Sequence, residues 1–319
     1  MRQISSSGFG ILCLIAGIAV FSVQDLILKG LSGDYPLHQA MVLRSLTALP
    51  FLIAIVRVFD GTLATIASRG WWQMSLRGLL NFCAYTAYYL GLATLPMPTT
   101  VALWFTAPLF ITLSAALILR ERVPFASALA VGLGFAGMLL ILRPGAAGFD
   151  LAALLPVLGA LGYAISMVVA RPMGRRETAA AMAFWGNACF LICALALSLV
   201  FGAGDLAQTS HPALGFLTRG WITPTARDLA LMASCGVIAA AGLTLLTHAY
   251  RIAPSAAVAP FEYSFMFWGV LWGWIFWGDM PDALAWCGIA VIIAAGLYII
   301  RQPAPAARPA RPVPPPEAA

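Results

Sequence analysis

Charged residues are scarce in this chain: they make up 9% of its 319 residues, whereas hydrophobic residues make up 61%. Soluble domains carry about 25% charged residues and roughly 45–50% apolar residues. These proportions argue against a soluble enzyme, a nucleic-acid-binding module and a disordered chain. The formal net charge of +6 is better explained by basic residues on the cytoplasmic side of a membrane than by binding to nucleic acid. The composition predicts an all-α polytopic membrane protein.

Metal ligands and catalytic motifs are also missing. The chain has three histidines, His38, His211 and His248, and its six cysteines all lie within apolar stretches. We therefore expect no metal site, no disulfide framework and no cofactor. The sequence contains no Walker A motif, no G-x-S-x-G and no H-E-x-x-H. These absences argue against ATP hydrolysis and leave a membrane-embedded enzyme as a remote alternative.

One apparent nucleotide-binding motif, G-x-G-x-x-G at Gly132, Gly134 and Gly137, lies in the middle of an apolar stretch. A dinucleotide-binding motif requires a preceding strand and a helix N-terminus that faces water. The three glycines therefore predict close packing between membrane helices.

Ten apolar stretches are each near the length that crosses the hydrocarbon core of a bilayer, which is about 20 residues. They are residues 8–28, 38–57, 72–93, 97–119, 125–142, 150–170, 180–201, 229–250, 254–276 and 283–300. If the N-terminus is cytoplasmic, the inner segments hold twelve Arg or Lys residues and the outer segments hold four. This bias predicts a multi-pass protein of the inner membrane with both termini in the cytoplasm.

The two halves of the chain repeat each other. Pro96 precedes Glu121 by 25 residues, and Pro254 precedes Asp279 by the same interval, at a constant offset of 158. Each half holds five expected spans, an odd number, so the halves enter the membrane from opposite sides. Such inverted repeats recur among transporters, whose solute site lies near the midplane between the halves.

We therefore expect three units along the chain. Residues 1–145 and 146–301 form two inverted five-helix repeats, and residues 302–319 form a disordered Pro/Ala-rich cytoplasmic tail.

Several stretches resemble one known family. In the first half they are FSVQDLILKG with Arg44 downstream, YYLGLATLPMPTTVALWFTAPLFITLSAALILRERV and GLGFAGMLLILRP, and in the second half AYRIAPSAAVAPFEYSFMFWGVLWGWIFWGDMP. The sequence resembles the EamA half-repeat of the drug/metabolite transporter superfamily over about residues 8–302. The resemblance implies a transporter, and members of that superfamily move amino acids, riboflavin-like cofactors, S-adenosylmethionine or drugs. Glu262-Tyr263 falls where the first half has Trp104-Phe105, so the halves differ chemically.

Four ionisable residues lie at membrane depth, where each costs about 2.5–3.5 kcal/mol to insert. Glu262 follows Pro260 by two residues in the ninth span. It is expected to carry a proton or to pair with the ammonium group of a solute, and the alternative is a hydrogen bond to a neighbouring helix. Asp25 and Lys29 share one face of the first span, with Arg44 at a similar depth in the second. For these three we favour a structural ion pair or an outer gate over a solute site.

His248 lies three residues before Arg251, near the cytoplasmic end of the eighth span. A single histidine in such a place is more often a hydrogen-bonded packing residue than a proton relay. We therefore keep the relay as the alternative.

Aromatic residues lie well inside several spans, whereas interfacial Trp and Tyr belong at span ends. The set, with one amide, comprises Asn81, Tyr85 and Tyr88 on one face of the third span, then Trp104, Tyr163, Trp185 and Tyr263 in later spans. Together with Glu262 they are expected to line a cavity for a flat or apolar solute. For any single aromatic residue, ordinary helix packing is the alternative.

These features predict a secondary transporter and not an enzyme. The first choice of activity is export of aromatic or apolar amino acids by alternating access. The alternative is uptake of a flat cofactor-like solute such as riboflavin or S-adenosylmethionine. The expected partners are the small organic solute, the lipid bilayer and, through Glu262, protons.

Overall fold

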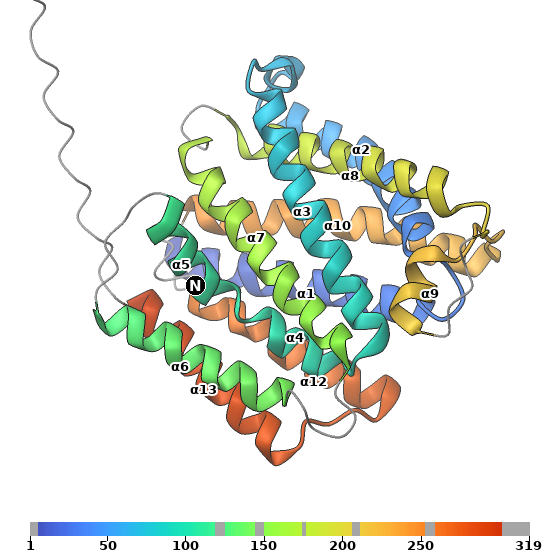
Figure 1. Cartoon of the computed structure of the whole chain (residues 1–319). Coiled ribbons are helices and arrows are strands. Elements are labelled where there is room, and N and C mark those ends of the chain that lie inside the picture. The colour runs from blue at the N-terminus through green and yellow to red at the C-terminus, as the bar shows by residue number, and fades with distance from the viewer. Residues whose placement is uncertain are drawn as a thin grey trace, which may run out of the picture.

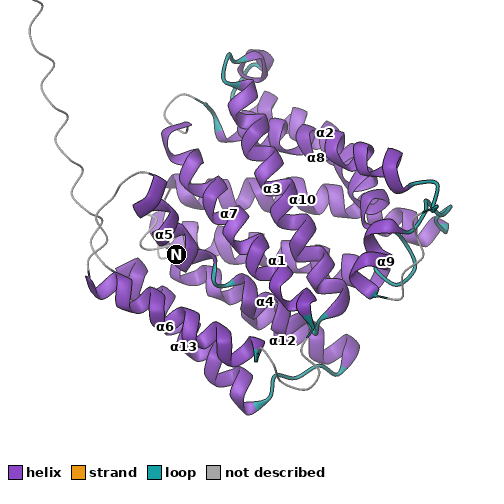
Figure 2. Ribbon diagram, viewed as in Figure 1, coloured by secondary structure: helices purple, strands orange, loops and turns teal. Residues whose placement is uncertain are grey.

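The computed structural model describes residues 6–118, 125–143, 150–173, 177–205, 211–252 and 259–301. Throughout this part of the chain the regular structure is helical and no strand occurs (Figure 2). The helices in chain order are α1 (Ser6–Leu31), α2 (Leu37–Phe59), η1 (Leu63–Ala67), α3 (Trp71–Thr94), α4 (Met97–Trp104), α5 (Ala107–Ile118), α6 (Phe125–Leu142), η2 (Leu151–Ala153), α7 (Leu154–Met173), α8 (Ala179–Phe201), α9 (Pro212–Thr218), α10 (Ala226–Ile252), η3 (Ala259–Tyr263), α12 (Ser264–Trp277) and α13 (Ala283–Arg301). The expectation of an all-α protein is therefore confirmed.

Six helical segments are long and apolar enough to cross a membrane by length and composition. They are Gly8–Leu31, Leu37–Phe59, Met97–Ile118, Leu151–Val169, Ala180–Phe201 and Ala226–Leu246. Large apolar side chains are exposed along the outside of the bundle, including Leu199 at 88% and Leu117 at 72%. Hydrocarbon is a favourable solvent for such a surface, whereas water is not. The protein is thus a multi-pass membrane protein.

The fourth expected span is not one continuous helix. α4 ends at Trp104 and α5 begins at Ala107, with a turn at Phe105 and Thr106. Pro108 follows the turn; it has no N–H to donate, and its ring would collide with the carbonyl of Trp104 in an unbroken helix. The Thr106 hydroxyl donates to the Leu103 carbonyl oxygen at 2.7 Å, which satisfies an acceptor released by the break. The span expected over 97–119 is thus found as Met97–Ile118, with its helix interrupted at Phe105 and Thr106.

The described part of the ninth expected span also begins irregularly. Residues 259–263 form the 3₁₀ helix η3, and α12 continues from Ser264. Pro260 and Glu262 lie in η3. Residues 253–258 lie outside the described part of the chain, so the expected start of this span at 254 is not placed.

Helices from distant parts of the chain pack in pairs, as Figure 1 shows for α6 beside α13 and for α3 beside α7. Glycines allow the α6–α13 contact: a Cβ at Gly137 would lie 2.9 Å from the Gly288 carbonyl oxygen. A Cβ at Gly134 would collide with Leu109, whereas Gly132 has no atom within 4 Å of its Cβ position. The expectation that this glycine run serves packing is thus confirmed for Gly134 and Gly137.

Gly288→Ala is expected to lower the stability of the protein by about 1–3 kcal/mol, the usual cost of overpacking. The added Cβ would lie 2.6 Å from the Gly137 carbonyl oxygen, and backbone cannot move aside as a flexible side chain can. The thermal midpoint of the purified protein in detergent measures the effect. Gly132→Ala is the matched control and should leave the midpoint unchanged or slightly raised. Equal midpoints for the two variants would contradict the packing assignment.

Candidate functional site

Four of the predicted aromatic residues meet in the interior. Tyr85 and Tyr88 come from α3, Trp104 is the last residue of α4, and Tyr163 comes from α7. The Trp104 ring lies 5.0 Å from Tyr88, 5.4 Å from Tyr163 and 5.5 Å from Tyr85, centroid to centroid. These four residues are called the aromatic cluster below. Their separations fall within the range of favourable ring–ring contacts.

Local sequence explains why the cluster forms. A Cβ at Gly159 in α7 would lie 2.6 Å from the Ala84 carbonyl oxygen in α3 and 3.1 Å from the Trp104 ring. Glycine at this position therefore lets α7 approach both α3 and α4. The break after Trp104 ends α4 at the depth where α3 presents its aromatic face.

Two further aromatic residues that the sequence interpretation missed extend the cluster. Phe190 of α8 lies 6.1 Å from Tyr85, and Tyr89 stacks on Tyr85 at 6.2 Å. Both residues are buried, at 7% and 2% exposure. Phe190 does not stand out in the sequence, because it is one of many apolar residues. Tyr89 does carry a signal, because it follows Tyr85 by four residues on one helix face.

A polar network adjoins the cluster and links α1, α2 and α3. Tyr88 donates its hydroxyl to Oδ2 of the buried Asp25 at 2.9 Å. Arg44 donates from Nε to Gln24 at 2.9 Å, and Gln24 donates to the Tyr89 hydroxyl at 2.7 Å. Tyr88 and Tyr89 thus connect the aromatic site to these side chains.

Lys29 has different partners from those expected. Its Nζ donates to the carbonyl oxygens of Leu92 at 2.8 Å and Leu95 at 2.6 Å, and it lies 5.2 Å from the centre of the Trp277 ring. The carbonyls at a helix C-terminus lack intrahelical donors, so the ammonium group caps α3 while it holds the ends of α1 and α12 nearby.

Asp25, Lys29 and Arg44 do not pair directly in this conformation of the described residues, although Arg44 and Asp25 interact electrostatically; the alternative of an outer gate stays a prediction. Within the described residues these three side chains make their hydrogen bonds to Tyr88, to backbone carbonyls and to Gln24. The spacing of Asp25 and Lys29 correctly placed both on α1, but packing offers each of them a nearer partner.

Glu262 and Tyr263 lie in η3, where the second half approaches the break in the first. The Tyr263 ring is 5.0 Å from Phe105, which forms the turn between α4 and α5. Glu262 is half-buried and interacts electrostatically with Tyr85 and Tyr163. The structure thus brings both residues to the edge of the aromatic cluster.

Two other predicted residues lie elsewhere or outside the described side chains. Trp185 donates its Nε1–H to the Ile66 carbonyl oxygen at 2.9 Å, and its ring lies 5.6 Å from that of Trp71. It therefore lies in the part of α8 that packs against η1. His248 lies in α10, and its side chain is outside the described part of the structure.

Arg77 is a site residue that the sequence interpretation missed. It lies one turn before Asn81 in α3 and interacts electrostatically with Tyr163 and Tyr85. Its position does carry a signal in the sequence: residues 77, 81, 85 and 88 follow the i, i+4, i+8, i+11 spacing of one helix face. The sequence alone could therefore have indicated Arg77 as a candidate site residue.

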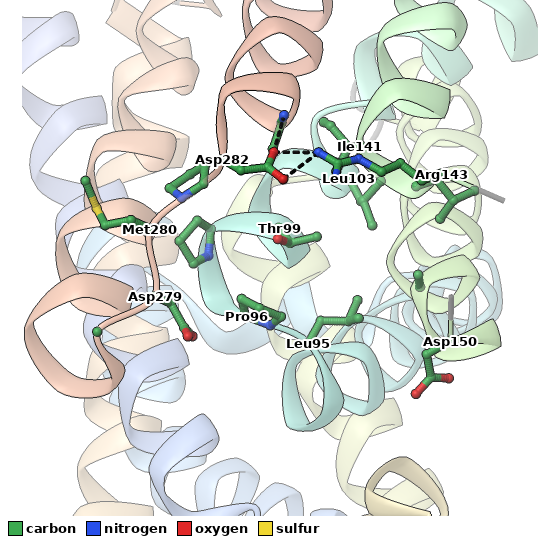
Figure 3. Close-up of a pocket in the computed structure, with 16 residues that line it drawn as sticks. Leu95, Pro96, Thr99, Leu103, Ile141, Arg143, Asp150, Asp279, Met280 and Asp282 are labelled. Atoms are coloured by element: carbon green, nitrogen blue, oxygen red, sulfur yellow. Dashed lines mark hydrogen bonds and ion pairs between the residues drawn. The ribbon is translucent and has the colours of Figure 1, made fainter. Parts of the chain in front are cut away.

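A cavity of about 540 Å³ opens near the ends of α3, α6 and α12 (Figure 3). It is lined by Leu95, Pro96, Pro98, Thr99, Leu103, Ile141, Leu142, Arg143, Asp150, Ala153, Gly278, Asp279, Met280, Pro281, Asp282 and Ala285. Its volume is in the usual range for small-molecule pockets, about 300–1,000 Å³. Leu103 lines the cavity and directly precedes Trp104, so α4 runs between the cavity and the aromatic cluster.

An ion pair crosses this cavity. Arg143, which follows α6, donates from Nη2 to Asp282 at 2.7 Å, and Asp282 also caps α13 by accepting from the Ala285 N–H at 2.8 Å (Figure 3). The guanidinium group and the backbone N–H hold the pKa of the Asp282 carboxyl below its ordinary value. Both partners are well exposed, so the pair orders the loop more than it stabilises the fold.

Comparison with known proteins places this chain in a family. The model of the EamA-like transporter family matches residues 8–143. The chain is 32% identical over 288 residues to a riboflavin transporter of Rhizobium johnstonii, covering 90% of this chain and 89% of the relative. It is 25% identical to an S-adenosylmethionine uptake transporter of Rickettsia prowazekii, covering 91% and 92% of the two chains.

A third relative has a name that describes an exporter. The chain is 24% identical to the pseudopaline exporter CntI of Pseudomonas aeruginosa, covering 92% of this chain and 96% of the relative. A solved crystal structure of a protein has the same fold, with a TM-score of 0.57 at 17% identity over 91% of this chain and 95% of that one. Identity above 30% over nine tenths of two chains, together with the family model, shows common membership. The chain therefore belongs to the EamA-like transporter family of the drug/metabolite transporter superfamily.

Proposed function

We propose that this protein is a secondary transporter that binds a flat organic solute at the aromatic cluster and moves it by alternating access. The observation that carries the proposal is the convergence of Tyr85, Tyr88, Trp104 and Tyr163 beside the break between α4 and α5. Interrupted helices at the centre of a transporter release backbone groups and form solute sites. Ring faces inside a membrane protein suit an apolar, planar solute.

The packing pattern supports two inverted five-helix repeats, residues 1–145 and 146–301, ahead of the tail at 302–319. In that arrangement α1 corresponds to α7, α2 to α8, α3 to α10, the α4–α5 pair to α12, and α6 to α13. A two-fold axis would exchange the α1–α10 contact with the α7–α3 contact, and the α2–α10 contact with the α8–α3 contact. All four contacts are present. Three further cross-contacts, α2–α8, α4–α12 and α6–α13, map onto themselves, and the contacts of α4 and α5 with α7 exchange with the contact of α12 with α1.

With this arrangement we also propose ten membrane spans, with both termini on the cytoplasmic side of the inner membrane. The excess of arginine and lysine in the segments assigned to the inside supports that orientation. The cavity at Arg143 and Asp282 then faces outward. Lys29, which joins the ends of α1, α3 and α12, would then act as an outer gate.

One residue is proposed to couple transport to protons. Glu262 lies at the edge of the aromatic cluster, where a proton or a solute ammonium group would meet it. For His248, near the cytoplasmic end of α10, packing is the favoured role and a proton relay is the alternative. Asp25 and Arg44 connect to the cluster through Tyr88 and, by way of Gln24, through Tyr89, and would transmit a change in the site to α1 and α2.

Two classes of solute fit the site. A flat cofactor-like solute taken up into the cell is supported by the cluster and by the relatives named for riboflavin and S-adenosylmethionine. An aromatic or apolar amino acid that is exported is supported by the cluster together with Glu262, which would pair with the ammonium group. Transport as such follows from family membership.

Purified protein in liposomes is expected to move at least one solute of a panel containing labelled riboflavin, S-adenosylmethionine, tryptophan and phenylalanine. Flux above that of protein-free liposomes measures transport, and competition among the four solutes ranks them. Because the aromatic cluster binds planar rings, riboflavin should compete best. Absence of flux for all four, in protein shown to be folded by its thermal transition, would count against the proposal.

A further inference from the structure

Among the residues that the structure describes, Nε of Arg77, Oδ1 of Asn81 and Oγ of Ser166 are buried near the aromatic cluster without a hydrogen-bond partner. Ser166 is fully buried, at 0% exposure. Native proteins leave few buried polar atoms unpaired. Such an atom has lost its hydrogen bonds to water and gains none within the protein, which lowers the stability of the fold. Such atoms call for a specific explanation, and a group supplied by a bound solute is one.

The three atoms belong to one place in the fold. Arg77 and Asn81 are one turn apart on the face of α3 that continues to Tyr85. Ser166 is three residues after Tyr163 in α7, on the same side of that helix. α3 and α7 pack closely here, since a Cβ at Gly162 would lie 3.3 Å from the Ala84 side chain and 3.8 Å from the Leu80 carbonyl oxygen.

Arg77 also lies within electrostatic range of the aromatic cluster. It interacts electrostatically with Tyr163 and Tyr85, which carry ring faces at the centre of the cluster. The unpaired atoms therefore form a polar margin next to stacked aromatic rings. A solute that inserts its ring among Tyr85, Trp104 and Tyr163 would present its edge to this margin.

The chemistry of the margin defines that edge. The Arg77 Nε–H can only donate, the Asn81 Oδ1 can only accept, and the Ser166 hydroxyl can do either. Side chains one helical turn apart are neighbours on the helix surface. In type, one donor and one acceptor complement a neutral ring edge with a carbonyl beside an N–H, as in a lactam or an imide. A zwitterionic amino acid fits less well, because its ammonium group brings three donors and its carboxylate brings two acceptor oxygens.

We propose that Arg77, Asn81 and Ser166 form a polar margin of the solute site that selects flat heterocycles whose ring edge carries a carbonyl next to an N–H group. This rests on the proposed function, because it assigns the solute class of the same aromatic site. Arg77 binds the carbonyl, Asn81 binds the N–H, and Ser166 pairs with whichever group of the edge lies nearest.

The test compares riboflavin, which has an imide edge, with its analogue in which a methyl group replaces the imide hydrogen. Inhibition constants are measured against uptake of whichever labelled solute of the panel the wild-type protein transports. The wild type should bind riboflavin about tenfold or more tightly than the methyl analogue, since the analogue leaves Asn81 unpaired. In Asn81→Ala the preference should fall to about threefold or less. Ser166→Ala offers a second, nearly isosteric variant if Asn81→Ala does not fold.

Leu79→Ala is the matched control on α3, because Leu79 is 42% exposed on the lipid side; this variant should retain the wild-type preference. Equal binding of riboflavin and its methyl analogue by the wild type would overturn the inference. So would transport of phenylalanine or tryptophan with no binding of either flavin, and that result would leave the transporter proposal standing. Absence of flux for every solute, with a normal thermal transition, would instead count against both.

Discussion

Glu262→Gln is expected to abolish solute movement driven by a proton gradient and to leave exchange of solute for solute largely intact. The amide keeps the shape of the carboxyl group and its capacity for hydrogen bonds, but it cannot take up and release a proton. The measurements are uptake into liposomes with an imposed pH gradient, and counterflow without one. If Glu262 carries the proton, only the first should be lost.

The position of Glu262 is the reason for this expectation. It lies in η3, two residues after Pro260, and interacts electrostatically with Tyr85 and Tyr163 of the aromatic cluster. A proton bound there would change the charge next to the solute. Ionisable groups at this depth are expensive to insert and are generally functional in membrane proteins.

Asp279→Asn is the matched control for Glu262→Gln, because Asp279 lines the cavity near the ends of α3, α6 and α12 and is not part of the aromatic cluster. This variant should retain gradient-driven uptake. Loss of exchange as well as driven uptake in Glu262→Gln would place Glu262 in the solute site itself. Wild-type flux that is the same at every pH would argue against proton coupling altogether.

Trp104→Ala is expected to raise the KM for the transported solute by about 10- to 100-fold. Trp104 contacts three rings of the cluster, and stacking of a flat ring on an aromatic side chain is worth about 1–3 kcal/mol. Concentration dependence of uptake in liposomes measures the change. Trp104→Phe retains a ring face and should keep most of the affinity, which separates lost stacking from lost folding.

Trp185→Ala is the control that distinguishes the cluster from aromatic residues in general. Trp185 packs on Trp71 and donates to the Ile66 carbonyl oxygen, away from the cluster. Its removal should leave the KM nearly unchanged. An increase as large as that of Trp104→Ala would contradict the assignment of the solute site to the aromatic cluster.

The periodicity and composition of the sequence were sufficient to predict several properties of this protein. The all-α membrane class, the family and the shared face of Asn81, Tyr85 and Tyr88 all followed from the order of residues. These properties depend on local backbone geometry and on total apolar content, which a sequence records directly. The gap between α4 and α5 was also within reach, because Pro108 signals a break.

Which side chains of different helices interact was decided only by the tertiary structure. Asp25 and Lys29 are spaced for an ion pair, yet Asp25 accepts from Tyr88 and Lys29 caps α3. Which neighbour a side chain meets depends on the rotation of its helix about its own axis and on how closely the next helix approaches. Close approach at Gly159 draws α7 onto α3 and α4 and thereby brings Tyr163 to Trp104, whereas Trp185, on α8, faces η1. Spacing along one helix carries no information about these distances, so only the packed bundle separates the aromatic residues of the site from the others.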